Sequence, residues 1–255
     1  MKRPSPHKCL HCKQFFLPNY RNGRRQKYCG EEDCQKASRW LENVVLMPED
    51  NLNESARCKV RSRELDAAQA RGSIAVDMDE LYKVLKPKLN PKWGEGPDIV
   101  DGGIRGRRAF AADLSGKAGA PAVIAVADKV TGGGRKVWQM FVPGLTADAV
   151  ATEGNRFVIK KGDATLVGTV VSPPGAKISA PMPPANTQPS KEKPDAAFRG
   201  IRIEAEDPRV GNFWVVMTLQ RGAAPPVQVS GAGLDAKVQV GNAKLTFRDD
   251  KLVWE

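Results

Sequence analysis

Four cysteines near the start of the chain are the residues whose types and spacing point most clearly to a chemistry. They follow the pattern Cys-x2-Cys-x16-Cys-x4-Cys, at Cys9, Cys12, Cys29 and Cys34. Two close pairs separated by a loop can place four thiolates around one Zn²⁺, with Zn–S distances of about 2.3 Å. A head of roughly 30 residues buries too little apolar surface to fold without a metal or crosslinks. We therefore predict a structural Zn²⁺ site, with two disulfides as the alternative.

The start of the sequence bears on the choice between zinc and disulfides. It begins MKRPSPHKCLHC, which is basic but lacks the apolar segment of a secretory signal. We therefore expect a cytoplasmic protein, in which thiols stay reduced and zinc is the favoured interpretation. No stretch approaches the ~18 apolar residues of a membrane span, so we expect no membrane partner. His11 lies between the first two cysteines and is interpreted as a bystander, because four thiolates already complete a tetrahedral shell.

A basic loop separates the two cysteine pairs. Residues 1–40 hold ten Lys/Arg against three Asp/Glu, a net charge of +7, whereas the whole chain carries +11. The loop side chains that could contact phosphates or stack on bases of DNA or RNA are Arg21, Arg24, Arg25, Lys27 and Tyr28. A solvated basic loop would have the same composition, so both interpretations stay open. The approach RRQKYC to the third cysteine resembles small bacterial zinc-ribbon or treble-clef-like proteins over about residues 8–40. The resemblance implies zinc and a possible nucleic-acid partner, but no enzyme activity.

The sequence divides into three segments. We predict a zinc-binding head over 1–48, which includes a helix over 35–46. A helical connector is expected over 49–99, with one helix from Asn53 towards Arg71 and a second one starting at Asp77 with an apolar face. The third segment, 100–255, has the short alternating runs of strands. The lone Cys58 in the connector is interpreted as a free thiol.

The third segment is expected to form an antiparallel β-sandwich, so that the chain as a whole is mainly β. Apolar residues alternate with polar ones: Val238 and Val240 alternate with Lys237 and Gln239, and Gly241-Asn242 suits a two-residue hairpin turn. The glycine run 131–134 is predicted to be a hairpin loop between the strands on either side of it. Strands are predicted over 108–115, 122–130, 136–142, 156–159, 164–171, 213–219 and 252–254.

Two carboxylates lie within these strand runs, Asp113 and Asp128. Nearby arginines, at 105, 107 and 108, could pair with them or with an acidic sugar. We interpret the carboxylates as ion-pair or turn residues rather than catalytic groups. Trp138 and Trp214 could stack on a sugar, but buried tryptophans are the norm in sandwiches, so we predict both to be core residues.

Three stretches of sequence within residues 100–255 resemble the C-terminal β-sandwich of heparinase II/III-type polysaccharide lyases. They are RRAFAADLSGKAGAPAVIAVADKVTGGGRKVWQMFVPG, ATLVGTVVSPPGAKI and NFWVVMTLQRG. The resemblance covers about residues 100–255. In that family the sandwich packs against a helical toroid, and acidic polysaccharide is cleaved by β-elimination with Tyr and His that come mostly from the toroid. This chain has no His or Tyr after Tyr82, and we expect no toroid in front of residues 100–255, so no catalytic residue carries over.

We therefore predict a non-catalytic, carbohydrate-associated β-sandwich fused to a zinc-binding head, with acidic polysaccharide as partner. No carbohydrate-binding residues can be assigned from the sequence, and we expect no lyase activity from the chain alone. One alternative is a zinc-dependent nucleic-acid-binding or regulatory protein. A second alternative is a structural subunit of a lyase whose catalytic toroid is on another chain. The lyase resemblance conflicts with the expected cytoplasmic location, since such lyases are generally exported.

Overall fold

The computed structural model describes residues 58–86, 98–142, 149–180 and 199–255, together with the backbone of 7–8, 15–16 and 45–46. The chain divides into two compact units, 1–44 and 45–255. In the first unit, strands β1 (His7–Lys8) and β2 (Phe15–Phe16) form an antiparallel pair. The predicted zinc ligands, the basic loop and most of the helix predicted over 35–46 lie outside the described residues. The last two residues of that predicted helix form strand β3 (Val45–Leu46) instead.

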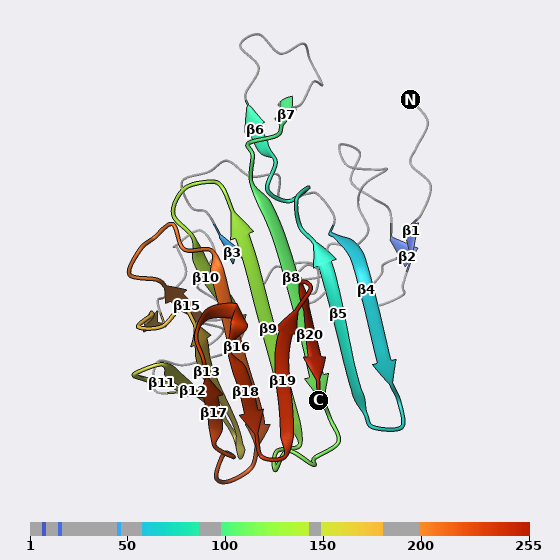
Figure 1. Ribbon diagram of the computed structural model, residues 1–255, viewed down its shortest axis with the longest axis vertical. Helices are drawn as coiled ribbons and strands as arrows, with labels where there is room; N and C mark the ends of the chain where they lie inside the picture. The colour runs from blue at the N-terminus through green and yellow to red at the C-terminus, as the bar shows by residue number, and fades with distance from the viewer. Residues whose placement is uncertain are drawn as a thin grey trace. The chain divides into compact units, whose positions relative to one another are not determined.

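An eight-stranded antiparallel sheet, here called the central sheet, organises the second unit (Figure 1). The prediction of a mainly β, antiparallel chain is confirmed, and the described residues contain no α-helix. Five strands of the central sheet match strands predicted from the sequence: β8, β9, β12, β13 and β16. In spatial order the strands are β11 (Val150–Glu153), β12 (Arg156–Lys161), β13 (Ala164–Ser172), β16 (Asn212–Gln220), β9 (Ala122–Thr131), β8 (Arg105–Asp113), β5 (Arg71–Asp77) and β4 (Lys59–Asp66).

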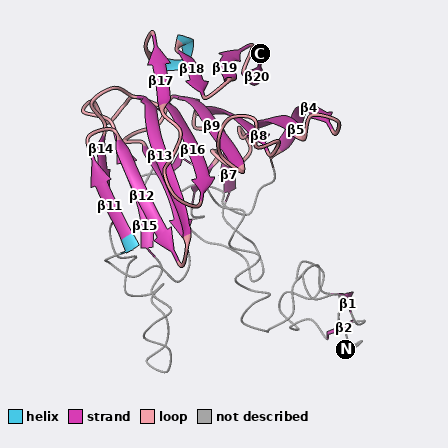
Figure 2. Cartoon of the chain, turned by 90° about the horizontal axis from the view of Figure 1, so that it is seen from below, coloured by secondary structure: helices cyan, strands magenta, loops and turns pink. Residues whose placement is uncertain are grey.

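Four strands at the end of the chain form a second antiparallel sheet, the C-terminal sheet, which packs on one face of the central sheet (Figure 2). The predicted alternation holds, since Val238, Val240 and Leu245 are buried and face the central sheet. The central sheet meets them with small residues such as Ala109 and Ala127, which allow close approach. The sheet contains β17 (Val227–Ser230), β18 (Lys237–Val240), β19 (Ala243–Arg248) and β20 (Lys251–Trp254), with a 3-10 turn at Gly233–Asp235.

A third sheet, the β10 sheet, covers part of the opposite face of the central sheet. Its inward side chains Trp138, Met140, Ile201 and Ile203 are buried. Trp138 and Trp214 are 1% and 0% exposed, which confirms the prediction that both are core residues. In spatial order its strands are β14 (Lys177–Ser179), β15 (Arg199–Glu204), β10 (Val137–Val142) and β3, and a separate pair is formed by β6 (Val84–Lys86) and β7 (Asp98–Val100).

The prediction of a helical connector is wrong for the described residues of that segment. In place of the helix predicted from Asn53 towards Arg71, the chain forms the antiparallel pair β4–β5. Strand β5 pairs with β8 from Arg71 opposite Asp113 to Asp77 opposite Arg107, so the central sheet extends across the predicted boundary at residue 100. The second predicted helix, starting at Asp77, is a turn followed by β6, and the Asp77 carboxylate accepts a hydrogen bond from the backbone N–H of Asp79 at 2.9 Å. Pairing with β8 outweighs the helical composition of the segment.

The glycine run 131–134 is also corrected by the structure. It connects β9 in the central sheet with β10 in the β10 sheet, so it crosses between layers and is not a hairpin loop. By contrast, the hairpin turn predicted at 241–242 is confirmed, and further hairpin turns join β12 to β13 and β19 to β20. Asp249 and Asp250 have φ angles of 51° and 59°, the left-handed backbone that a tight two-residue hairpin turn requires.

A buried ion pair within the central sheet is hydrogen-bonded to a second layer. Asp128 on β9 is 0% exposed, and both of its oxygens bind Arg108 on β8, at 2.6 Å from Nε and 2.8 Å from Nη2. The indole N–H of Trp138, on the β10 sheet, donates to the same carboxylate at 3.0 Å. Burial alone would lower the pKa of Arg108, but the adjacent carboxylate raises it above its ordinary value, so the guanidinium stays charged. Asp128 is thus a structural ion-pair residue, as the sequence predicts.

Removal of this carboxylate charge should destabilise the protein strongly. Asp128→Asn keeps the shape but leaves a buried guanidinium without its counterion, and we expect a loss of about 3 kcal/mol in the free energy of unfolding. The matched control is Asp101→Asn, which neutralises a solvent-exposed partner of Arg105 and should change the urea midpoint little. Equal urea midpoints for the two variants would contradict the claim that the Asp128 charge stabilises the fold.

Candidate functional site

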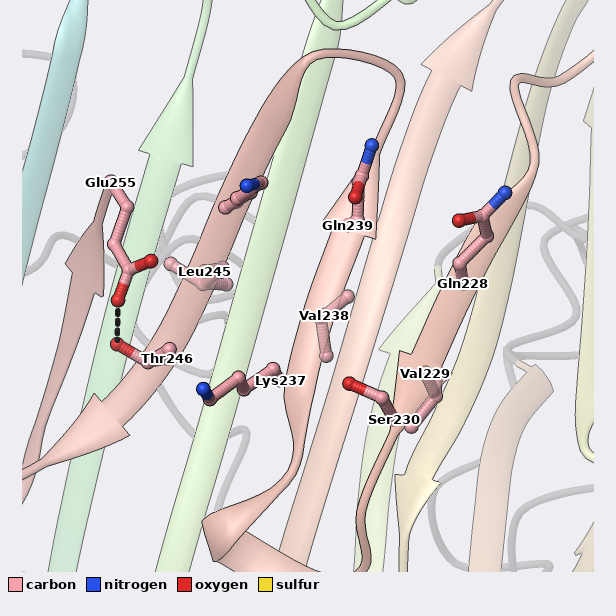
Figure 3. Close-up of a pocket in the computed structure, with 10 residues that line it drawn as sticks. Gln228, Val229, Ser230, Lys237, Val238, Gln239, Leu245, Thr246 and Glu255 are labelled. Atoms are coloured by element: carbon pink, nitrogen blue, oxygen red, sulfur yellow. Dashed lines mark hydrogen bonds between the residues drawn. The ribbon is translucent and has the colours of Figure 1, made fainter.

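The outer face of the C-terminal sheet is hollowed. A depression of about 380 Å³ lies over strands β17, β18 and β19 and the end of the chain (Figure 3). Polar side chains predominate in its lining, which makes it a surface for hydrogen-bonding or charged ligands. It is lined by Gln228, Val229, Ser230, Lys237, Val238, Gln239, Lys244, Leu245, Thr246 and Glu255.

Strand register gathers these polar side chains. Since Val238 points towards the central sheet, its neighbours Lys237 and Gln239 point outwards. Lys237 lies directly opposite Thr246, and Gln239 lies directly opposite Lys244. The two lysines are therefore diagonal neighbours on adjacent strands, a relation that typically separates them by about 7–8 Å. Two cations at that spacing can contact one anionic group, or two anionic groups along one polymer.

The same register adds neutral donors and acceptors on strand β17. Gln228 lies opposite Gln239, and Ser230 lies opposite Lys237. The Gln239 side chain is anchored, because its amide N–H donates to the carbonyl of Gly241 at 3.0 Å. The result is a strip of amide and hydroxyl groups beside the two cations.

The charges in the depression are unevenly compensated. Glu255 already accepts hydrogen bonds from Arg248 at 2.8 Å and from Thr246 at 3.4 Å, a contact drawn in Figure 3. Lys237 and Lys244 form no ion pair with any residue of the described part of the chain. Among the described residues, the depression thus leaves two cations unpaired for an incoming anion, while its carboxylate is already paired. Such a surface is suited to binding an anionic, hydrogen-bonding ligand.

The one tyrosine of the sheet region is buried. Tyr82 is 1% exposed and is the only tyrosine in residues 58–255. Burial, with a smaller contribution from Asp128, raises the pKa of its hydroxyl well above its ordinary value. Tyr82 is therefore a core residue of the described structure.

The second carboxylate singled out by the sequence anchors the C-terminal sheet. Asp113 on β8 is 1% exposed and accepts a hydrogen bond from Nε of Arg71 on β5 at 2.9 Å. The Arg71 guanidinium in turn lies 5.4 Å from the ring centre of Trp254 on β20, a cation–π contact. Asp113 therefore helps to hold the layer that carries the depression. The other two arginines pair at the surface, Arg105 with Asp101 at 2.7 Å and Arg107 with Asp79 at 2.7 Å.

The remaining predicted site residues fall into two groups. The predicted zinc ligands at 9, 12, 29 and 34 and the predicted nucleic-acid-binding residues at 21, 24, 25, 27 and 28 lie outside the described ranges. Cys58 is described, is exposed and forms no disulfide, as predicted. Burial, above all, raises the pKa of its thiol. Within 58–86, 98–142, 149–180 and 199–255, no cluster of His, Cys, Asp and Glu could hold a metal ion, and no helix is long and apolar enough to cross a membrane.

Comparison with known proteins gives matches among solved structures alone. No protein-family model matches the chain, and no curated protein matches it. The fold is similar to heparan sulfate lyase HepC from Pedobacter heparinus, with TM-score 0.46, 11% identity, and 89% of this chain and 32% of that chain covered. It is also similar to the heparinase III BT4657 gene product, with TM-score 0.48, 12% identity, and 89% and 33% covered. A further heparinase III has TM-score 0.46, 12% identity, and 95% and 34% covered.

The chain spans about a third of the length of these lyases. A likeness at this level of identity and TM-score does not establish a shared family or a shared activity. It leaves the chemistry of the depression itself as the basis for a functional proposal.

The ion pair under the C-terminal sheet should make stability depend on pH. Burial opposes the charge on Asp113, but hydrogen bonds from Ser115 and Arg71 outweigh it and lower the pKa of this carboxyl. The unfolded chain therefore takes up the proton first. The stability that Asp113 contributes is present in full above its ordinary pKa of about 4, and it is lost as the pH falls through the lower folded pKa.

We expect Asp113→Asn to lower the urea midpoint at neutral pH and to flatten its decline below about pH 4. Glu153→Gln on β11 is the control for removing one carboxylate elsewhere, since Glu153 is exposed and forms no ion pair among the described residues. Parallel pH profiles of urea midpoints for wild type and Asp113→Asn would contradict this role of the Arg71–Asp113 pair.

Proposed function

We propose that the 45–255 unit is a non-catalytic binding module for acidic polysaccharide, and that the outer face of the C-terminal sheet is its binding surface. The observation that carries the proposal is the pair Lys237 and Lys244, which project on one face without counterions among the described residues. Carboxylate or sulfate groups of a polysaccharide are the natural partners of such cations.

The neutral groups around the lysines favour a sugar polymer over a simple ion. Gln228, Ser230 and Gln239 form a strip next to the cations, and their amide and hydroxyl groups match the alternating hydroxyls of a sugar chain. The position of the depression on the outer face of a sheet suits a ligand that continues on both sides of the contact. The sequence resemblance of residues 100–255 to the sandwich of polysaccharide lyases agrees with this ligand class.

The absence of a proton-transfer group in the depression supports binding without turnover. β-elimination requires a base for the proton next to the uronate carboxyl group and an acid for the leaving oxygen. The lining of the depression includes neither His nor Tyr, and Glu255 is held by Arg248. A toroid on another chain could supply these groups. In that case, mixing with such a chain would produce the absorbance of unsaturated uronate products, while the chain alone would not.

Neutralisation of the two lysines should weaken polysaccharide binding. We expect Lys237→Gln/Lys244→Gln to raise the Kd for a uronate-containing polysaccharide about tenfold, measured by affinity electrophoresis or calorimetry at low salt. Lys160→Gln/Lys161→Gln on β12 removes the same charge from exposed positions elsewhere and should leave the Kd nearly unchanged. Equal effects of both double variants would mean that net charge, and not this surface, determines binding.

The amino-terminal head supports a second proposal. We propose that Cys9, Cys12, Cys29 and Cys34 bind one structural Zn²⁺, as their spacing indicates. The basic loop between the two pairs would then be held by the metal and could contact the phosphates of DNA or RNA. The charge of +7 over residues 1–40 is the observation that favours this function.

Zinc analysis and nucleic-acid binding test the head separately. We expect the purified full chain to contain about one Zn²⁺ and to lose it to a strong chelator, and Cys29→Ser should abolish the metal content. If nucleic acid is the partner, binding in a gel assay should weaken steeply with salt and disappear on chelation. Oxidised thiols without bound zinc would refute the metal site, and binding insensitive to salt would refute the phosphate contact.

A further inference from the structure

Strand β4 forms one edge of the central sheet. It hydrogen-bonds to β5 on one side, and no strand of the described residues pairs with its other side. The strand is eight residues long, and seven of the eight are exposed. Val60 and Leu65 are 56% and 70% exposed, among the most exposed large apolar residues described. A long edge with exposed apolar side chains is a template for a further strand.

The order of residues along β4 shows which strand would fit. The ladder to β5 shifts between Val60 and Ser62, so Arg61 is the extra residue of a bulge. The seven positions that remain in the ladder are Lys59, Val60, Ser62, Arg63, Glu64, Leu65 and Asp66. Reversed about its middle residue, this series sets the charged ends, and the apolar residues next to them, against complementary partners.

We propose that β4 pairs antiparallel with β4 of a second copy of this chain, about a two-fold axis at Arg63. Lys59 then lies opposite Asp66 of the second copy, and Val60 lies opposite Leu65 of the second copy. Each of these pairs occurs twice in such a symmetric contact. Opposite charges and apolar pairs directly across a ladder are the combinations that stabilise neighbouring strands.

The bulge is what makes the faces agree. Directly opposed residues of antiparallel strands must lie on the same face of the sheet. Lys59 lies opposite Asp77 and Asp66 lies opposite Arg71 in the ladder to β5, so both belong to the same face, although their numbers differ by an odd count. Val60 and Leu65 share the other face for the same reason. Without the extra residue Arg61, Lys59 and Asp66 would lie on different faces of the sheet, and so would Val60 and Leu65, so neither pair could form.

The remaining positions set the strength of the contact. Ser62 lies opposite Glu64 of the second copy, and the extra residue Arg61 stands beside Ser62, near that carboxylate. At the centre, Arg63 meets Arg63 of the second copy, a like-charge pair that opposes association. A contact along one edge is smaller than the about 800 Å² per partner of a standard interface, so we expect a weak dimer with a Kd of about 10 µM.

The dimer has a consequence for ligand binding that rests on the proposed function. The C-terminal sheet packs on one face of the central sheet, and Lys251 on β20 reaches Glu64 on β4 at 3.5 Å. A two-fold axis perpendicular to the joined sheet keeps that face common to both copies. The lysine surfaces of the two copies then lie on the same side, where one polyanion can engage both and gain avidity.

Sedimentation of the full chain tests the dimer without any ligand. Over loading concentrations from about 1 to 200 µM, which bracket the expected Kd, the weight-average mass should rise from 27.7 kDa towards twice that value. Leu65→Lys should abolish the rise, because it sets a lysine against Val60 of the second copy, while Leu114→Lys, at a position 60% exposed outside β4, should not. Arg63→Thr removes the central repulsion and should strengthen the dimer several-fold.

A compensating pair separates this contact from a general loss of folding. Val60→Glu should also abolish the rise in mass, and Val60→Glu/Leu65→Lys should restore it, because glutamate and lysine then face each other twice across the axis. Both residues are exposed, so circular dichroism of each variant should match that of the wild type. A wild type that stays monomeric throughout, or a double variant that fails to regain the dimer, would overturn the proposal. Neither result depends on whether polysaccharide binds.

Discussion

Burial of both faces of the central sheet is the constraint on which the rest of the structure depends. Strand β9 illustrates it, because its alternate residues face different layers. Ala125 and Ala127 pack beneath the C-terminal sheet, whereas Asp128 faces the β10 sheet. A buried carboxylate is tolerated there only because Arg108 neutralises it and Trp138 supplies a further hydrogen bond. One side chain thus connects two adjacent strands and a second layer.

The C-terminal sheet can present a polar outer face because most of its inner face packs into the core. Val238 and Leu245 bury their side chains against alanines of the central sheet, and the salt bridge of Arg71 with Asp113 supports the position of Trp254 in β20. With the strands fixed in this way, alternation places Lys237 and Lys244 on the outer face of the sheet. The positions of the two cations therefore follow from the packing beneath them, and they need no direct contact with each other.

Much of the strand content follows from the sequence, and the exceptions have physical causes. The strands β9, β16, β18 and β19 follow from alternation and turn residues that lie within the strand or next to it. The segment 59–77 instead contains Arg, Glu and Ala-Ala-Gln-Ala, which favour a helix locally. Strand β5 is held by pairing with β8 and β4 by pairing with β5, and no local pattern encodes the contact with β8. The crossing of 131–134 between layers is hidden from the sequence for the same reason.

The ion pairs and the depression differ in how far the sequence reveals them. Asp128 and Asp113 are visible because a charge inside an apolar strand run demands a partner, and three arginines precede them. The lysines at 237 and 244 look like ordinary exposed strand residues, since alternation predicts their exposure without indicating what lies across the ladder. Only the registers of β17, β18 and β19 bring them together with Gln228 and Ser230. Strand pairing turns separate exposed polar residues into one site, and strand pairing is the feature that is hardest to predict from the sequence.

The most direct measurement is a titration of the ¹⁵N-labelled full chain with a uronate-containing polysaccharide, followed by amide chemical shifts. Binding at the outer face of the C-terminal sheet predicts shifts that are concentrated in β17–β19 and at Glu255, with β12 and the buried strand β16 largely unaffected. Shifts confined to the amino-terminal 40 residues, or no shifts at saturating polysaccharide, would contradict it.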